Sequence, residues 1–162
     1  MAAVDFFLEI DGIKGESADH KHKDTIEISS FSWGVTNSGS HGSGGGGGTG
    51  KSAYQDVHCT TGVSTASPNL MLACATGQHI KKATLYVRKA GGEQQDYYTV
   101  TMTDVLISSY QSGAHGSGDP KPTDQFSLNF AKIEFEYKPQ KSDGSLGSAQ
   151  KTGYDVKANK KA

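Results

Sequence analysis

The sequence has no long hydrophobic run, few cysteines and no excess of charge of either sign. Without an apolar stretch of about 18 residues or more, no transmembrane helix is expected. Two cysteines, Cys59 and Cys74, are too few for a disulfide framework, and we expect both to be small core residues. The 16 basic and 17 acidic side chains leave a net charge of -1. This balance argues against nucleic acid or an anionic membrane as the main partner.

Motifs of catalysis and of metal binding are missing as well. The sequence contains no H-E-x-x-H, no C-x-x-C and no G-x-S-x-G pattern. It has 6 histidines, several of them in charged or glycine-rich segments, such as His20, His22, His41 and His115. We expect the histidines to be solvated surface residues. The sequence therefore predicts a protein that is not an enzyme and that needs no metal or cofactor.

Glycine, by contrast, is abundant. Of the 21 glycines, 8 lie between Asn37 and Ser52. Gly45–Ser52 matches the phosphate-binding pattern G-x-x-x-x-G-K-[ST], in which Gly45, Gly50, Lys51 and Ser52 would hold a nucleotide. That mechanism requires a hydrophobic strand before the loop and a helix after it. The residues before the loop are not apolar, and Ala53–Thr61 is typical of a strand. We interpret the match as chance and expect no nucleotide site.

Both ends of the sequence carry information about location. Met1–Glu9 lacks a basic region and meets an acidic residue at once, so it does not resemble a signal peptide. We therefore expect synthesis in a reducing bacterial cytoplasm and, if the protein is exported, a route that needs no signal peptide. The last residues, including Lys151, Lys157, Lys160 and Lys161, are expected to form a solvated basic end.

Short alternating runs predict a mainly β protein of 162 residues in one domain, residues 1–162. In the first run, Val4, Phe6, Leu8 and Ile10 share one strand face, while Phe7 lies on the other. Thr84–Lys89 and Asp96–Met102 flank Ala90–Glu93 and indicate a hairpin. About eight strands with these turns indicate a small barrel of two sheets, from which a long glycine-rich loop protrudes.

Two further features refine this fold. A short helix is expected at about residues 66–76, with Ser67 as its cap, Pro68 in its first turn and Gly77 at its end. In Gln125–Tyr137 the apolar alternation changes phase at Phe130–Lys132. That slip predicts a β-bulge or a sharp bend where the strand passes from one sheet to the other.

Several segments, in order, match a known family. They are Val4–Ile10, Lys14–Ser17, Phe31–Gly34, Ser67–Cys74, Arg88–Glu93, Ser127–Ile133 and Tyr137–Gly144. Together they resemble the haemolysin co-regulated protein (Hcp) family, whose members are tube subunits of the bacterial type VI secretion system. The Pro68–Cys74 and Arg88–Glu93 segments are the most specific, and the resemblance covers nearly the whole chain.

The resemblance implies a structural role. Members of the family form homohexameric rings with a wide channel, and the rings stack into a tube that a contractile sheath drives out of the cell behind a spike. The channel carries and protects small effectors. In the family a long loop reaches the adjacent ring or subunit. By position this loop is Thr36–Ser52, and its ring-stacking candidates are Gly39, Gly42, Gly44, Gly45, Gly46, Gly47, Gly48, Gly50 and Lys51. Ser32 is the candidate for the wall that faces the effector.

One alternative from a different class remains open at this point. A non-catalytic β-barrel that binds a sugar or a peptide would need exposed aromatic side chains, for which Trp33 and Tyr54 are the candidates. Phe31 and Trp33 are instead interpreted as a pair in the core or at an interface. Neither function predicts binding to nucleic acid or insertion into a membrane.

Overall fold

The structure is a computed structural model that describes residues 4–38, 51–89, 94–118 and 121–162. The expected glycine loop and the Ala90–Glu93 turn lie largely or wholly outside these residues. The elements in chain order are β1 (Val4–Ile10), β2 (Ile26–Ile28), β3 (Ser30–Asn37), β4 (Ser52–Gly62), α1 (Ala66–Thr76), β5 (Ile80–Lys89), β6 (Asp96–Gly113), β7 (Thr123–Tyr137), β8 (Gln150–Asp155) and β9 (Lys160–Lys161). No helix in the described part of the chain is long and apolar enough to cross a bilayer.

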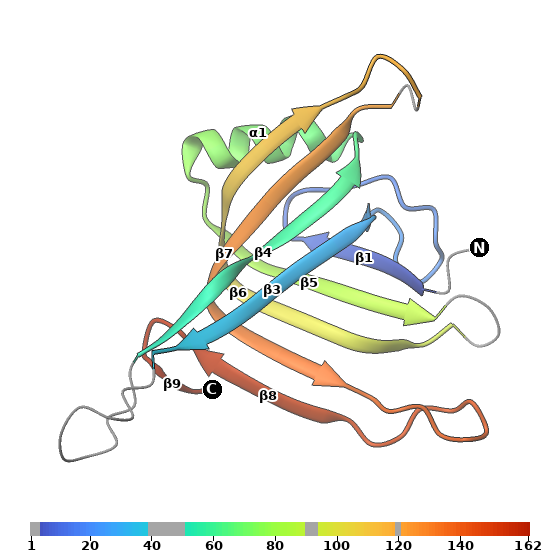
Figure 1. The fold of residues 1–162 in the computed structure, drawn as a ribbon, viewed down its shortest axis with the longest axis vertical. Coiled ribbons are helices and arrows are strands. Elements are labelled where there is room, and N and C mark those ends of the chain that lie inside the picture. The colour runs from blue at the N-terminus through green and yellow to red at the C-terminus, as the bar shows by residue number, and fades with distance from the viewer. Residues whose placement is uncertain (1–3, 39–50, 90–93, 119–120) are drawn as a thin grey trace.

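All of these strands belong to one antiparallel sheet. The strands follow the order β2-β1-β5-β6-β7-β4-β3, and β8 and β9 continue from the other half of β7 (Figure 1). The two ends of this order, β2 and β3, are successive segments of the chain joined at Ser29, so the sheet returns on itself. The Ser29 N–H donates to the carbonyl of Thr60 in β4 at 2.7 Å. The two sheets expected from the sequence are therefore two halves of a single closed sheet.

Alternation of apolar side chains explains where the core lies. Leu8 of β1 and Leu85 of β5 stand opposite each other and are fully buried, as the first alternating run predicts. The β5–β6 pairing predicted from the hairpin pattern is present. The buried cluster collects apolar side chains from β1, β2, β4, α1, β5, β6 and β7. Cys59 belongs to it, while Cys74 is half-buried at its border.

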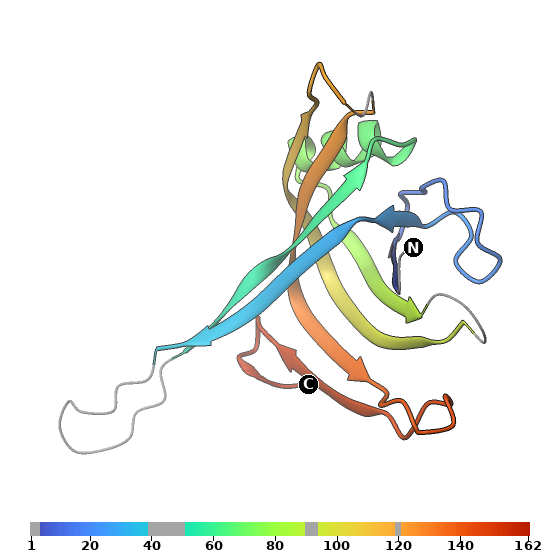
Figure 2. The ribbon, with the colours of Figure 1, turned by 45° about the vertical axis from the view of Figure 1, so that its right-hand side comes forward.

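The phase change predicted in β7 is a bend shared with β6. In β7 the buried positions switch from Phe126, Leu128 and Phe130 to Ile133, and the strand curves strongly there (Figure 2). The register with β6 is unbroken at this point, so the alternative of a β-bulge in β7 is wrong. Asp104 of β6, which lies at this point, has a left-handed backbone conformation with a φ of 54°, and this conformation bends the strand. The neighbour of β7 changes here too, from β4 to β8.

The helix is present, but its start differs from the prediction. Gly77 ends α1 in the left-handed conformation, with φ 65°, as expected. Thr65 rather than Ser67 is the N-cap residue, and it makes no side-chain capping bond. The Ser67 hydroxyl instead donates to the buried carboxylate of Asp124 and accepts the backbone N–H of Ser64. The Ser67 side chain is therefore bonded to a residue distant in the sequence, and the local sequence gives no sign of this bond.

Candidate functional site

Of the phosphate-loop match, Lys51 and Ser52 lie among the described residues. Lys51 is exposed and is followed by strand β4, which begins at Ser52, whereas the phosphate-binding pattern requires a helix at this point. Gly45 and Gly50 lie outside the described residues, as do the other glycines of the expected stacking loop. The strand predicted for Ala53–Thr61 is therefore present, and the interpretation of the match as chance stays a prediction.

Ser32 lies on the outer face of β3. Its neighbours Phe31 and Trp33 turn inward: Phe31 packs edge-on against Phe6, and Trp33 packs edge-on against Phe135. Ser32 is exposed and stands opposite His58 of β4. Because side chains alternate along a strand, the burial of the two aromatic rings directs the Ser32 hydroxyl to the outside.

The strands next to Ser32 carry a surface that is nearly free of charge. We call it the hydroxyl–amide face; it comprises the outward residues Ser30, Ser32, Asp56, His58, Thr60, Leu106, Ser108, Ser109, Gln111, Gln125, Ser127 and Asn129 of β3, β4, β6 and β7. Residues paired across neighbouring strands form rows on this face; one row consists of Thr60 of β4, Gln125 of β7 and Gln111 of β6. Asp56 is its one carboxylate and His58 its one imidazole.

A hydrogen-bond network fixes the centre of this face. The Asp56 carboxylate accepts from the Ser108 hydroxyl at 2.6 Å and from the Asn129 amide at 2.9 Å. The Ser127 hydroxyl lies 2.7 Å from that of Ser108 and 2.5 Å from that of Ser109. A register shift between Ile107 and Ser109 brings both of these hydroxyls over Ser127. The network therefore satisfies the single carboxylate and is preformed.

Beyond the bend, the outer side of the same sheet is charged. We call this part the charged face; it comprises Glu9, Lys82, Lys132, Glu134, Glu136, Lys151 and Asp155 of β1, β5, β7 and β8. Glu134 is the centre of a small ladder, with its carboxylate oxygens 3.5 Å from Lys132 Nζ and 3.9 Å from Lys151 Nζ. These groups are about one-third or more exposed and remain in contact with solvent.

A loop covers the part of β1 and β5 next to the charged face. We call residues 14–25 the strap. Its two ends are held together by the N–H of Gly15, which donates to the carbonyl of Asp24 at 2.8 Å. A side chain at Gly15 would collide with the carbonyl of Thr25, so the close approach requires glycine.

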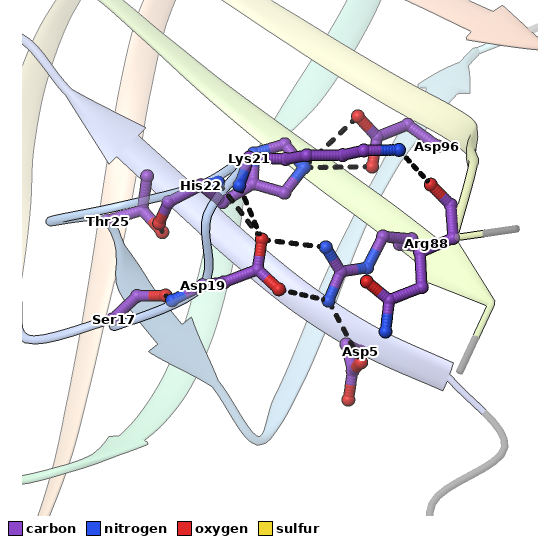
Figure 3. Close-up of polar contacts among 9 residues, drawn as sticks. Asp5, Ser17, Asp19, Lys21, His22, Thr25, Arg88 and Asp96 are labelled. Carbon is purple, nitrogen blue, oxygen red and sulfur yellow. Dashed lines mark hydrogen bonds and ion pairs between the residues drawn. The ribbon is translucent and has the colours of Figure 1, made fainter. Parts of the chain in front are cut away.

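Ion pairs fasten the strap to the sheet (Figure 3). The guanidinium of Arg88 donates to both oxygens of Asp19, at 2.8 and 2.6 Å, and its contact with Asp5 is longer, at 3.5 Å. Arg88 is 3% exposed and stacks over the Phe7 ring. The hydrogen bonds from Arg88 hold the pKa of the Asp19 carboxyl well below its usual range. The backbone N–H groups of Lys21 and His22 also donate to this carboxyl and lower its pKa further. The strap is thus attached through a buried charge.

His22 corrects the expectation that the histidines are solvated. Its ring is buried between Phe7, at 4.7 Å, and Tyr86, at 4.6 Å, and Nε2 lies 3.0 and 3.1 Å from the two oxygens of Asp96. His20, His58, His79 and His115 are exposed as expected, and His41 lies outside the described residues. The alternation of histidine and lysine in residues 20–23 does not indicate that His22 is buried. Its partners lie far away in the sequence, on β1, β5 and β6.

Of the other candidate groups, Cys59 behaves as predicted. Burial raises the pKa of its thiol to about 12, which leaves it unreactive at neutral pH. Neither Trp33 nor Tyr54 is an exposed ring: Trp33 Nε1 donates to the Tyr98 hydroxyl at 2.7 Å, and Tyr54 stacks on Tyr154 at 5.6 Å. The described residues contain no group of three metal-ligating side chains.

Two of the hollows between described residues lie next to these features. The larger, about 710 Å³, lies between the strap, β1, β2 and the segment after β4, and includes Arg88 with its carboxylate partners in its wall. The smaller, about 500 Å³, lies at one end of the hydroxyl–amide face, where Gln111, Thr123 and Gln125 are joined by His115, Ser117 and Lys121. Arg88 and its partners, and this second hollow, are features that sequence reasoning did not find.

Comparison with known proteins gives consistent results over the full length. The family model described as "Type VI secretion system effector, Hcp" matches residues 7–137. Protein hcp1 of Pseudomonas aeruginosa is 43% identical over 162 residues, which is 99% of both chains.

Solved structures agree in fold. A structure described as a type six secretion system protein has a TM-score of 0.94 at 30% identity, covering 99% of this chain and all of the other. Hcp1 from Salmonella typhimurium has a TM-score of 0.83 at 34% identity, with the same coverage. These likenesses confirm the mainly β fold with one short helix.

Proposed function

The chain belongs to the Hcp family of the type VI secretion system, and we propose that six copies of it close into a ring around a wide channel. As a member, it is a secreted, non-enzymatic tube protein that works with the other components of that machine. The match to protein hcp1 supports this proposal, because nearly the whole chain, 99%, aligns with nearly the whole of that relative.

We further propose that residues 1–162 act as one domain and that rings stack through the glycine-rich loop. β3 and β4 remain paired out to Asn37 and Ser52, so the two ends of the loop are held side by side at the tip of this hairpin. The hairpin projects away from the rest of the sheet (Figure 2), and β7 pairs with β4 only from Val57 onward. A projecting two-stranded arm is weakly stable alone, which supports a contact with another ring.

The channel is proposed to carry small effectors, with Ser32 on its wall. Ser32 is exposed on a rigid strand, and the Phe31 and Trp33 rings on either side fix its direction. The tube would be assembled in the bacterial cytoplasm, enclosed by a sheath and tipped by a spike, and exported without a signal peptide. We propose that these steps need no cofactor, no nucleic acid and no insertion into a membrane.

Electron microscopy of the purified protein tests the ring directly. Negative-stain images should show annular particles, and mass photometry of the same sample should give a mass near six times 17.1 kDa. A monomer at every concentration, without annular particles, would contradict the proposal. The alternative of a sugar- or peptide-binding module has lost its support, because Trp33 and Tyr54 are packed against other rings instead of being exposed.

A further inference from the structure

The strap is closed at its base, and its tip, residues 18–23, belongs to no strand. Besides the bond between Gly15 and Asp24, the N–H of Asp24 donates to the carbonyl of Ser17 at 2.9 Å, and the N–H of Ser17 donates to the carbonyl of Thr25 at 3.1 Å. These bonds connect the two ends of the strap to each other. The tip can therefore move as a unit while β1 and β2, which precede and follow the strap in the chain, stay in place.

Three polar side-chain contacts between described residues hold the tip against the sheet (Figure 3). The first is the ion pair with Arg88. The other two reach the chain at the start of β6: Lys21 Nζ donates to the carbonyl of Gln94 at 2.8 Å, and His22 Nε2 lies 3.0 and 3.1 Å from the two oxygens of Asp96. The tip of the strap therefore also holds the beginning of β6.

The contact at His22 differs from the other two because it contains a group that changes charge near neutral pH. An imidazole gains or loses its proton between about pH 5 and pH 8 in ordinary surroundings. The His22 side chain is 7% exposed, so an added proton is held inside the protein, next to the Asp96 carboxylate. A charge on the donor strengthens a bond to a carboxylate, and it does so more in a buried site than in water. Protonation of His22 therefore strengthens the hold on the tip.

The other groups around the ring do not cancel this attraction. The charged or titratable groups on the elements packed against His22 are Asp5 and Glu9 of β1, Tyr86 and Arg88 of β5, Asp96 of β6, and Asp19, Lys21, Lys23 and Asp24 of the strap. The Arg88 cation is already paired with both oxygens of Asp19, and burial raises the pKa of the Tyr86 phenol, which therefore stays neutral. Asp96 is 31% exposed, so its contact with solvent reduces the cost of burying the charged pair.

We propose that the contact between His22 and Asp96 is a proton-dependent clasp: protonation of the imidazole fastens the tip of the strap to β6, and loss of the proton loosens it. As the pH falls from about 8 to about 5.5, the closed strap gains stability, because opening would separate the charged ring from its carboxylate. The pair of Asp19 and Arg88 stays ionised over this range, since Arg88 holds the pKa of Asp19 far below it. The clasp lies within one subunit, so it operates whether or not rings form.

Hydrogen–deuterium exchange of the full chain, followed by mass spectrometry on peptides from residues 14–25, measures how often the strap opens. Exchange is expressed as protection factors, which remove its intrinsic dependence on pH, at about pH 5.5, 6.5 and 8. Protection of the tip should rise about threefold to tenfold from the highest pH to the lowest, the effect of up to one tenfold step in proton affinity. Protection of β7 should not follow this rise, and size exclusion at each pH verifies that the assembly state is the same.

His22→Gln is the decisive variant, because the glutamine amide can donate to Asp96 but cannot take up a proton. The strap of this variant should be equally protected at all three pH values. His20→Gln is the matched control: His20 is an exposed histidine of the same strap, and its substitution should leave the pH dependence of the wild type unchanged.

Asp96→Asn is a second variant, which leaves the imidazole in place. Without the carboxylate, protonation of His22 no longer favours the closed strap, so the rise of protection toward acid should disappear. A wild-type strap that is equally protected at all three pH values would overturn the proposal. So would a pH dependence like that of the wild type in His22→Gln or in Asp96→Asn.

Discussion

The hydroxyl–amide face and the charged face lie on the outer side of one sheet, yet they differ in the number of charged side chains that they carry. The first contains one carboxylate, held by Ser108 and Asn129. The second carries a ladder of exposed lysine and glutamate side chains and adjoins the strap with its buried Arg88. The two are separated by the bend at Asp104, where β7 exchanges β4 for β8. One sheet thus carries a nearly uncharged surface on one side of the bend and a charged surface on the other.

The largest expected effect comes from the charged half, at Arg88. Arg88→Ala leaves the Asp19 carboxylate without its bidentate partner and should lower the free energy of unfolding by about 3 kcal/mol. This value lies at the low end for buried pairs because Asp19 is 15% exposed. Urea denaturation at one fixed protein concentration measures it, because assembly also contributes to stability.

Lys138→Ala is the control for this change. Its ammonium lies 3.8 Å from the Glu136 carboxylate at a site that is 39% exposed, so the loss should be at most about 1 kcal/mol. Equal losses for Arg88→Ala and Lys138→Ala would mean that the strap is not attached through a buried charge.

A pH series examines the same pair without removing it. The folded-state pKa of Asp19 is depressed by Arg88, so the stability it contributes is present above the pKa of the unfolded carboxyl, about 4. It is lost progressively as the pH falls below that value. The urea midpoint of the wild type should therefore decrease steeply toward acid, and Asp19→Asn should reduce the slope.

Asp143→Asn provides the comparison for the pH series. The Asp143 carboxyl is hydrogen-bonded by Ser145 at the surface, which lowers its pKa, and no ion pair joins it to another described residue. Its substitution should change the acid slope less than Asp19→Asn does. A slope that Asp19→Asn leaves unchanged would show that the strap's carboxylate does not control acid sensitivity.

The smallest effect is expected on the hydroxyl–amide face. Ser127→Ala removes the hydroxyl shared by Ser108 and Ser109 and should cost about 1 kcal/mol, since Ser127 is buried beneath them. Glu134→Gln on the charged face breaks two contacts of 3.5 and 3.9 Å and should cost less than Ser127→Ala, because exposed ion pairs contribute little. Thermal denaturation of both variants compares them; a larger loss for Glu134→Gln would reverse the contrast between the two faces.

The sequence predicted the elements better than their contacts. Periodicity identified the first strand and the phase change at Phe130–Lys132, and the preference of glycine for helix ends identified Gly77. These features depend on residues close together in the chain. The roles of Ser67 and His22 were predicted wrongly because their partners are distant: Asp124 is 57 residues from Ser67, and Asp96 is 74 from His22. The Arg88–Asp19 pair spans 69 residues and left no local signal.

The two faces could not be predicted for a related reason. Each is assembled by cross-strand register, and a shift of one residue would turn its side chains inward. Ser32 was placed by family resemblance, but His58 and Gln125 join it only through the pairing of β3, β4 and β7. The bulge that stacks Ser108 and Ser109 over Ser127 depends on the same pairing.

An electron cryomicroscopy reconstruction of the assembled ring tests the central claim most directly. It would show which side of the sheet lines the channel. The account predicts that Ser32, His58 and Gln125 face the channel and that Glu134 and Lys151 do not. A ring whose channel is lined by the charged face, or in which Gln125 is buried between subunits, would contradict it.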